Sequence, residues 1–326
     1  MAEQSCQDFE LCIADDCSPD HRQEELRTLL RELKMRFVFR QQQLNVRYDA
    51  NLRTAIALAS GRFCLLMGND DQLSHPHVLR DLRQVLECYP TAGVVIPNYA
   101  EYSGERVYRR SSSTALRRSG PELAVRVFRN FSFVSGLILR RDRAQSHATT
   151  QWDGSEMYQM YLGCRIIAEG FDLVEVAGIA VQKSILLEGA SVDSYAKRPR
   201  VKAWPLRERR LPLGQMGSLV FDAVRPFAPD GSALGLRIFS QILLFTYPFW
   251  IVEYRRVQSW HYAVGICLGM RPRNILHQTN LRTVDRLSIR IMYVMMSLAG
   301  LAVPISLFQT CQSKLHAFAK YNFRRH

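Results

Sequence analysis

Two pairs of adjacent carboxylates follow two apolar segments of this chain. Asp15-Asp16 comes directly after residues 9–14, and Asp70-Asp71 comes shortly after residues 63–67. Carboxylate oxygens are preferred ligands of Mg²⁺ and Mn²⁺, which proteins commonly bind through one or two acids together with substrate phosphates. A nucleotide diphosphate would supply such phosphates. Either pair alone is most simply a solvated loop, but two pairs in equivalent positions favour a binding site.

The segments around these acids alternate between extended and helical patterns. Strand-like apolar segments cover residues 9–14, 37–39, 63–67 and 93–96, and helical patterns cover residues 21–35, 51–59 and 77–88. This alternation predicts an α/β domain with a mainly parallel sheet flanked by helices. Ligands of such sheets bind at the carboxyl ends of the strands, where both acidic pairs fall. A receiver-type phosphoacceptor domain would leave more than half of the chain unexplained.

Two of these segments resemble a known family. FELCIADDCSPD (residues 9–20) and NLRTAIALASGRFCLLMGNDDQL (residues 51–73) look like the nucleotide-sugar-binding half of the family 2 inverting glycosyltransferases, which have the GT-A fold. The resemblance covers residues 1 to about 190 and is strongest to bacterial O-antigen and capsule sugar transferases, such as abequosyltransferases. It implies sugar transfer from a nucleotide-sugar donor to a saccharide acceptor, with inversion, in cell-surface polysaccharide biosynthesis.

The resemblance also implies roles for the acidic pairs. Asp16 matches the aspartate that contacts the nucleotide base, with Asp15 beside it, and Asn51 and Asp70 belong to the same nucleotide-sugar-binding set. Asp71 matches the last aspartate of the DxD-like motif, so Asp71 with Asp70 would hold Mg²⁺ or Mn²⁺ on the donor pyrophosphate. Many members have an acid where this chain has Asn69, and a lower metal affinity is therefore expected.

A further metal ligand of the family is missing from the sequence. Many members place a histidine near the end of the domain to assist the metal, but residues 182–191 contain none. His75 and His77 follow the acidic pair closely. The intervening Pro76 is more typical of a helix-entry turn than of a metal site.

Later segments carry the expected acceptor and catalytic residues. Residues 131–141 resemble the strand that approaches the acceptor sugar, which assigns Ser135 and Gly136 to acceptor binding; a plain core strand explains the same pattern equally well. Glu156 aligns with the catalytic base at the start of a helix, and Asp153 is its competitor. Inversion needs such a carboxylate to take the proton of the attacking hydroxyl. The alternative for Glu156 is helix capping.

The family's opening strand and helix have no counterpart before residues 9–14. Residues 1–7 resemble the last turn of that helix, so a central strand of the sheet and part of the nucleotide pocket would be absent. Two explanations are open: a start placed downstream of the true one, which the intact motifs favour, or a truncated product that binds nucleotide poorly.

The positive charge of the chain is concentrated near its C-terminus. Residues 1–196 carry 23 basic and 25 acidic side chains, whereas residues 197–326 carry 20 and 5. Residues 197–210 alone hold seven Lys or Arg. A basic region that is also apolar and aromatic favours an anionic membrane surface, and nucleic acid is not the expected partner. We therefore expect residues 1–196 to form the transferase domain and residues 197–326 a helical membrane-associating region.

Two uncharged runs support this expectation. Residues 238–252 and 291–308 are flanked by arginines, and the longer run, of 18 residues, would be about 27 Å long as a helix, just short of a typical hydrocarbon core of ~30 Å. We rank monotopic association first, a buried helical domain second and a true span third. The arrangement suits a lipid-linked saccharide acceptor and a cytoplasmic protein, peripheral or monotopic at the inner face of the plasma membrane.

Other features place the chain in a reducing compartment. The first ten residues contain neither an apolar run nor a basic region, so no signal peptide is expected, and the eight cysteines include no CxxC pair. Two alternative functions remain at this point. One is a catalytically disabled membrane-bound interaction protein derived from such an enzyme, and the other is a nucleic-acid-binding protein that uses the basic region.

Overall fold

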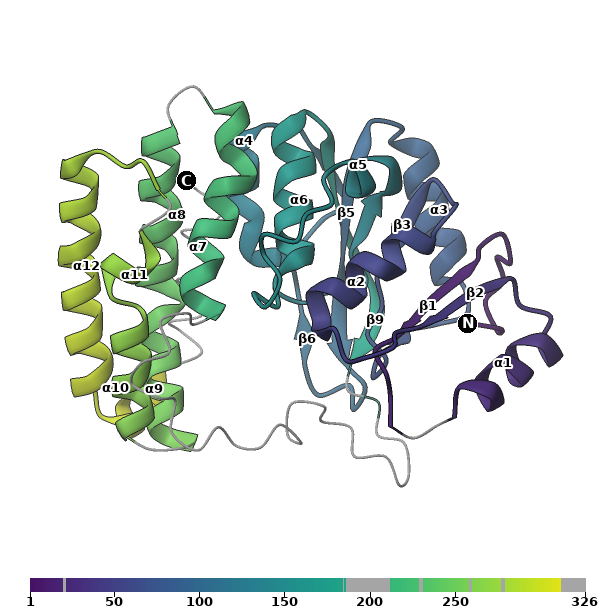
Figure 1. The fold of residues 1–326 in the computed structure, drawn as a ribbon, viewed down its shortest axis with the longest axis horizontal. Helices are drawn as coiled ribbons and strands as arrows, with labels where there is room; N and C mark the ends of the chain where they lie inside the picture. Colours follow the sequence, from purple (N-terminus) through teal and green to yellow (C-terminus); the bar gives the residue numbers. More distant parts are fainter. Residues whose placement is uncertain are drawn as a thin grey trace. The chain divides into compact units, whose positions relative to one another are not determined.

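A computed structural model describes residues 1–19, 22–183, 185, 212–228, 231–257, 260–276 and 279–311 (Figure 1). The chain divides into two compact units. The first comprises Met1–Leu123 and Val127–Val192, and the second comprises Ala124–Arg126 and Asp193–His326. The expected boundary at residues 196 and 197 lies outside the described residues, as does the basic segment 197–210.

The first unit begins with a small parallel sheet. Strand β1 (Leu11–Asp15) pairs with β2 (Phe37–Gln41), from Leu11 opposite Phe37 to Asp15 opposite Gln41. Helix α1 (Gln23–Glu32) connects the two strands, as parallel pairing requires. Among the described residues, β1 pairs with no strand of the larger sheet.

The larger sheet has seven strands, in the order β3-β8-β5-β9-β4, with β6 on β5 and β7 on β9. Their bounds are β3 (Phe63–Leu65), β4 (Gln72–Leu73), β5 (Ala92–Glu101), β6 (Val107–Tyr108), β7 (Ala115–Arg117), β8 (Ile138–Arg140) and β9 (Asp172–Lys183). Among the described pairings of this sheet, only that of β5 with β9 is parallel. The expectation of a mainly parallel sheet is therefore wrong for this sheet. Buried strands are apolar on both faces in either direction, so hydropathy could not reveal the antiparallel pairings.

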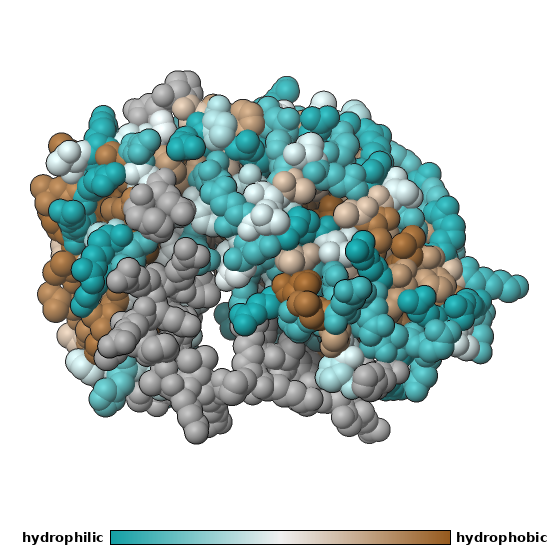
Figure 2. Space-filling model, viewed as in Figure 1, coloured by the Kyte–Doolittle hydropathy of each residue, from teal (hydrophilic) through white to brown (hydrophobic). Residues whose placement is uncertain are grey.

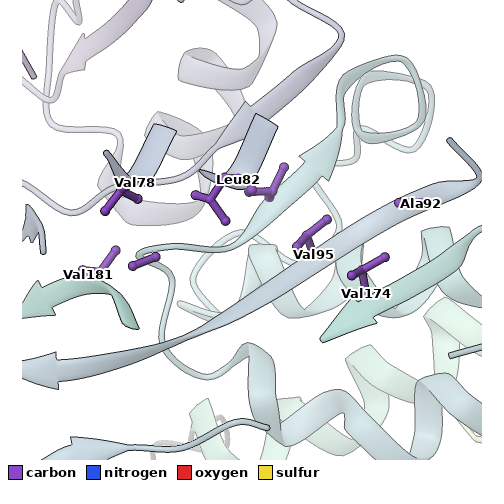
Figure 3. Close-up of a cluster of buried hydrophobic side chains, with 8 residues drawn as sticks. Val78, Leu82, Ala92, Val95, Val174 and Val181 are labelled. Carbon is purple, nitrogen blue, oxygen red and sulfur yellow. The ribbon is translucent and has the colours of Figure 1, made fainter. Parts of the chain in front are cut away.

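Helices flank this sheet, as expected (Figure 1). Their bounds are α2 (Arg47–Leu58), α3 (Val78–Cys88), α4 (Pro121–Val127), the 3₁₀ helix η1 (Phe128–Phe131), α5 (Arg141–Ser146) and α6 (Tyr158–Glu169). Val78 and Leu82 of α3 pack on Val95 of β5 and on Val174 and Val181 of β9 (Figure 3). Helix α6 packs closely on β5, because a Cβ added to Gly93 would lie only 2.6 Å from Ile166 Cγ2. Leu65, Met67 and Leu73 also pack against this core, which thereby positions the segment that carries Asp70 and Asp71.

The second unit is helical. It contains α7 (Pro212–Val224), the 3₁₀ helix η2 (Arg225–Phe227), α8 (Gly231–Phe245), α9 (Tyr247–Val257), α10 (Trp260–Gly269), α11 (Pro272–Ile275) and α12 (Thr283–Ala302). Small residues allow close helix packing: a Cβ on Gly217 would lie 2.3 Å from Phe239, and one on Gly300 would lie 2.8 Å from Ile251. The buried Tyr247 hydroxyl lies 2.7 Å from that of Ser297. The unit therefore has its own packed core.

The two uncharged runs adopt different forms. Residues 238–252 lie within a 26-residue helical stretch, Gly231–Arg256, which is the one described helix long and apolar enough to cross a membrane; 44% of its most apolar window is buried inside the protein. Residues 291–308 do not form one helix, because α12 ends at Ala302 and the next helix, Ile305–Cys311, turns away by 105°. Pro304 disfavours helical backbone at Val303 and so causes this break. The ranking of membrane modes stays a prediction.

Candidate active site

Two carboxylates converge where β3 leads into β4. A Cβ added to Gly68 would lie 3.0 Å from both Asp70 Oδ1 and Asp71 Oδ2, and 3.3 Å from Ser135 Oγ. Any larger residue at position 68 would displace these oxygens. Two carboxylate oxygens and a hydroxyl thus surround one small volume, an arrangement that suits a hard cation.

Ser135 ties Asp71 to the sheet. Its fully buried hydroxyl accepts a hydrogen bond of 2.7 Å from the Gly68 N–H and donates one to Asp71 Oδ2. The hydroxyl is thereby used inside the protein, which favours positioning of Asp71 over direct acceptor binding. The acceptor-binding assignment of Ser135 and Gly136 stays a prediction.

The segment around Ser135 is not the continuous strand expected over residues 131–141. Gly136 has a φ of +84°, in the left-handed region that favours glycine, and its N–H donates to the Leu66 carbonyl. The chain therefore turns before β8, which covers only Ile138–Arg140. Apolar composition alone did not reveal this turn.

The donor set fits a divalent cation. Asp70 and Asp71 supply the one or two carboxylates that Mg²⁺ or Mn²⁺ commonly uses, with the remaining positions left for substrate phosphates and water. Over the described residues, no group of three or more His, Cys, Asp and Glu side chains is placed to hold a metal. His77 instead lies with Nδ1 3.0 Å from Ser5 Oγ.

The predicted nucleotide-contacting residues gather at the end of β1 and the start of α2. The Asp16 carboxylate accepts hydrogen bonds of 2.7 and 2.9 Å from the N–H groups of Val46 and Arg47. Asn51 Nδ2 donates to the Ala14 carbonyl at 2.8 Å, and Asp15 accepts from the Ser18 N–H at 3.2 Å. These bonds fix both loops, and each carboxylate oxygen keeps capacity for a further donor. Their contacts with a nucleotide stay a prediction.

A buried aspartate that the sequence did not single out organises the loop containing Glu156. Asp49 is 1% exposed, and its carboxylate accepts hydrogen bonds of 2.8, 2.9 and 3.1 Å from the N–H groups of Gly154, Glu156 and Tyr158. Burial raises the pKa of Asp49, while these three hydrogen bonds act in the opposite direction. Asp49 caps the start of α6, so Glu156 is not required for capping.

Glu156 and Asp153, the two candidate bases, have different surroundings. Asp153 forms a two-point ion pair with Arg53, at 2.6 and 2.8 Å, and Arg53 also donates to the Thr149 carbonyl. Glu156 sits at a φ of +60°, an uncommon backbone conformation for a non-glycine residue that the Asp49 bonds maintain. This φ does not by itself single out Glu156, because Cys17, Lys34 and Arg47 also have positive φ values. The catalytic role of either residue stays a prediction.

An aromatic stack also lies near Asp71. The Tyr99 ring stacks between Tyr108, at 4.7 Å, and Phe133, at 4.1 Å, with the Arg110 guanidinium 4.9 Å from the Tyr99 centroid. Burial raises the pKa of Tyr99, and the nearby Asp71 carboxylate adds to that effect. Burial lowers the pKa of Arg110 to about 10. No spacing in the sequence brings these residues together, because they come from β5, β6 and two loops.

Comparisons with known proteins identify relatives of this chain. Residues 1–145 match the family model described as glycosyl transferase family 2. Abequosyltransferase RfbV of Salmonella typhimurium is 25% identical over an alignment of 175 residues, and the match covers 48% of this chain and 48% of that protein. The chain therefore aligns with about half the length of this curated relative.

Solved structures show that the fold of this chain is similar to that of known proteins. S. aureus TarS 1-349 in complex with UDP matches with a TM-score of 0.59 at 12% identity, covering 91% of this chain and 84% of that one. TarS 1-349 in complex with UDP-GlcNAc matches with a TM-score of 0.57 at 13% identity and the same coverage. Residues 1–145 are therefore similar in sequence to glycosyl transferase family 2, and the first unit has a GT-A-like fold.

Proposed function

We propose that the protein transfers a sugar from a nucleotide-sugar donor to a saccharide acceptor, with inversion at the anomeric carbon, in cell-surface polysaccharide biosynthesis. The observation that carries this proposal is the convergence of the Asp70 and Asp71 carboxylates beside Ser135, at a strand end of the segment that is similar to family 2. The named relative, an abequosyltransferase, supports the O-antigen type of product.

One group of residues is proposed to bind the donor. Asp15, Asp16 and Asn51 would line the nucleotide pocket, while Asp70 and Asp71 would hold Mg²⁺ or Mn²⁺ on the donor diphosphate. The bound ion would supply positive charge to the departing diphosphate. Ser135 keeps Asp71 in place through its hydroxyl, so the carboxylate needs no reorganisation when the donor binds.

Glu156 is the proposed general base. The acceptor hydroxyl oxygen attacks the anomeric carbon as the bond to the diphosphate oxygen breaks, and the hydroxyl proton passes to the Glu156 carboxylate. Attack from the face opposite the leaving group inverts the anomeric configuration. Asp49 holds the backbone of Glu156 and so sets where the base can lie.

Binding of the donor is the first test. We expect calorimetric titration with UDP-, GDP-, TDP- and CDP-sugars in the presence of Mn²⁺ to give one binding nucleotide class, with affinity at least tenfold weaker after the metal is chelated. A protein that bound none of these donors would favour the disabled interaction protein instead.

The two candidate bases can be separated by substitution. Glu156→Gln is expected to lower the transfer rate by about 10²- to 10⁴-fold, the usual contribution of a general base, with unchanged donor affinity. Asp153→Asn should keep most of the rate, because it loses only a partly exposed ion pair worth about 0.2–1 kcal/mol of stability. Initial rates and donor titrations on both variants check this, and the reverse order of rates would make Asp153 the base.

The acceptor is proposed to be lipid-linked and the protein peripheral or monotopic at the inner face of the plasma membrane. The basic C-terminal region and the apolar helices of the second unit support this location. Nucleic acid is not an expected partner.

A further inference from the structure

One face of α12 carries an uncovered apolar stripe. Its members recur every three or four residues, with two adjacent members at 294 and 295, and are each 51–72% exposed: Val284, Leu287, Ile291, Val294, Met295 and Leu298. This spacing places them along one side of the helix over about 21 Å. Figure 2 shows hydrophobic residues gathered over α12, the helix drawn in yellow in Figure 1.

The opposite face of α12 is fixed within the second unit. Asp285, Ile289, Ser297 and Gly300 are buried there. Asp285 accepts hydrogen bonds from the Ser232 hydroxyl at 2.7 Å and from Arg282 at 2.9 Å. The helix therefore cannot turn its apolar stripe inward without breaking these contacts, and the stripe is a stable feature of this surface.

A shallow, open cleft with three arginines in its lining lies beside the stripe. It has a volume of about 430 Å³ and is lined by Arg271, Pro272, Arg273, Arg290, Tyr293 and Val294. Val294 belongs to both the cleft and the stripe, so the two are continuous. No acidic side chain lines the cleft, and within the described stretches of the second unit no ion pair engages its three arginines.

Two acids of the second unit are paired with arginines outside the cleft. Glu253 is paired with Arg256 at 2.5 Å, and Asp285 is paired with Arg282 at 2.9 Å. The cleft therefore keeps a net positive charge directly next to exposed aliphatic side chains. A surface of this kind matches the boundary of an anionic bilayer, where phosphates lie beside hydrocarbon.

We propose that the α12 stripe and this cleft together form the surface that docks on an anionic lipid membrane. The aliphatic side chains enter the boundary between headgroups and acyl chains, and the arginines bind a headgroup phosphate. This docking surface rests on the proposed function only in that the enzyme acts at a membrane. Helix α12 would lie along the membrane surface, because the buried Asp285 opposes passage of this helix through hydrocarbon.

Vesicle flotation tests the surface directly. We expect the full chain to float with phosphatidylcholine vesicles that contain phosphatidylglycerol and to bind pure phosphatidylcholine much less. Arg271→Ala/Arg273→Ala/Arg290→Ala should weaken binding on the order of 100-fold at low salt. Leu287→Gln/Leu298→Gln should remove the binding that persists at high salt. Leu44→Gln is the matched control, since Leu44 and Leu298 are both 64% exposed and Leu44 lies in the first unit.

The outcomes separate this inference from the proposed enzyme. Absence of vesicle binding by the unmodified chain, or binding by the α12 variants equal to that of the Leu44→Gln control, would overturn the docking surface. Variants that shift a dimer to a monomer without changing flotation would assign the stripe to a second copy and overturn it as well. Donor titration on the same variants should remain unchanged, so a failure of nucleotide binding alone would contradict only the proposed function.

Discussion

Replacing Asp71 with Asn is expected to lower the rate of sugar transfer on the order of 1,000-fold. The Asp71 carboxylate shares the space over Gly68 with Asp70 and is oriented by Ser135. The amide removes one negative charge from the site that would face the cation on the donor diphosphate. The largest effect is expected on turnover, because the leaving group gains charge in the transition state.

The measurement is the initial transfer rate at saturating donor over a range of Mn²⁺ concentrations. Asp81→Asn is the control, because Asp81 is a half-exposed acid of α3 paired only with the adjacent Arg80 among the described ion pairs. We expect Ser135→Ala to lose a smaller part of the rate and to need more Mn²⁺, since it leaves the carboxylate in place but unoriented. A fully active Asp71→Asn protein with an unchanged metal requirement would contradict the metal-site assignment.

Several elements between β1 and β5 could be predicted because each carries a local signal. The apolar runs before Asp15 and Asp70 became β1 and β3, and the leucine stripe of residues 21–35 became α1. The pairing of strands could not be predicted in this way. Strand β8 enters the sheet through a turn at Gly136, and that turn depends on contact with Leu66, which is distant in the sequence. Direction and neighbour are tertiary properties, whereas apolar periodicity is local.

The site shows the same division. Adjacent acids after a strand are visible in a sequence, and Asp70 and Asp71 do converge. Asp49 gave no signal, because an acid in the first turn of a helix is ordinary there. Its function arises only when the loop at 154–158, more than a hundred residues later, folds over it. Supporting residues of this type need the fold before they can be recognised.

Removal of Asp49 is expected to have the largest effect on stability. Asp49→Ala leaves three backbone N–H groups at residues 154, 156 and 158 without their acceptor and opens a small cavity, which together should cost about 3–5 kcal/mol of unfolding free energy. Asp49→Asn should fall between this variant and the parent. Its amide oxygen can still accept, whereas its NH₂ group faces an N–H that needs an acceptor.

Chemical denaturation and hydrogen exchange together test this role. The unfolding midpoint should be lower than that of the parent in Asp49→Asn and lowest in Asp49→Ala. In both variants the amides of residues 154–158 should exchange faster than those of β5. Asp153→Asn is the control, because it touches the same loop through a partly exposed ion pair. Transfer should fall along with protection of this loop, since Glu156 loses the contact that holds its backbone. An Asp49→Ala protein with unchanged loop protection would show that the loop is held by its other contacts.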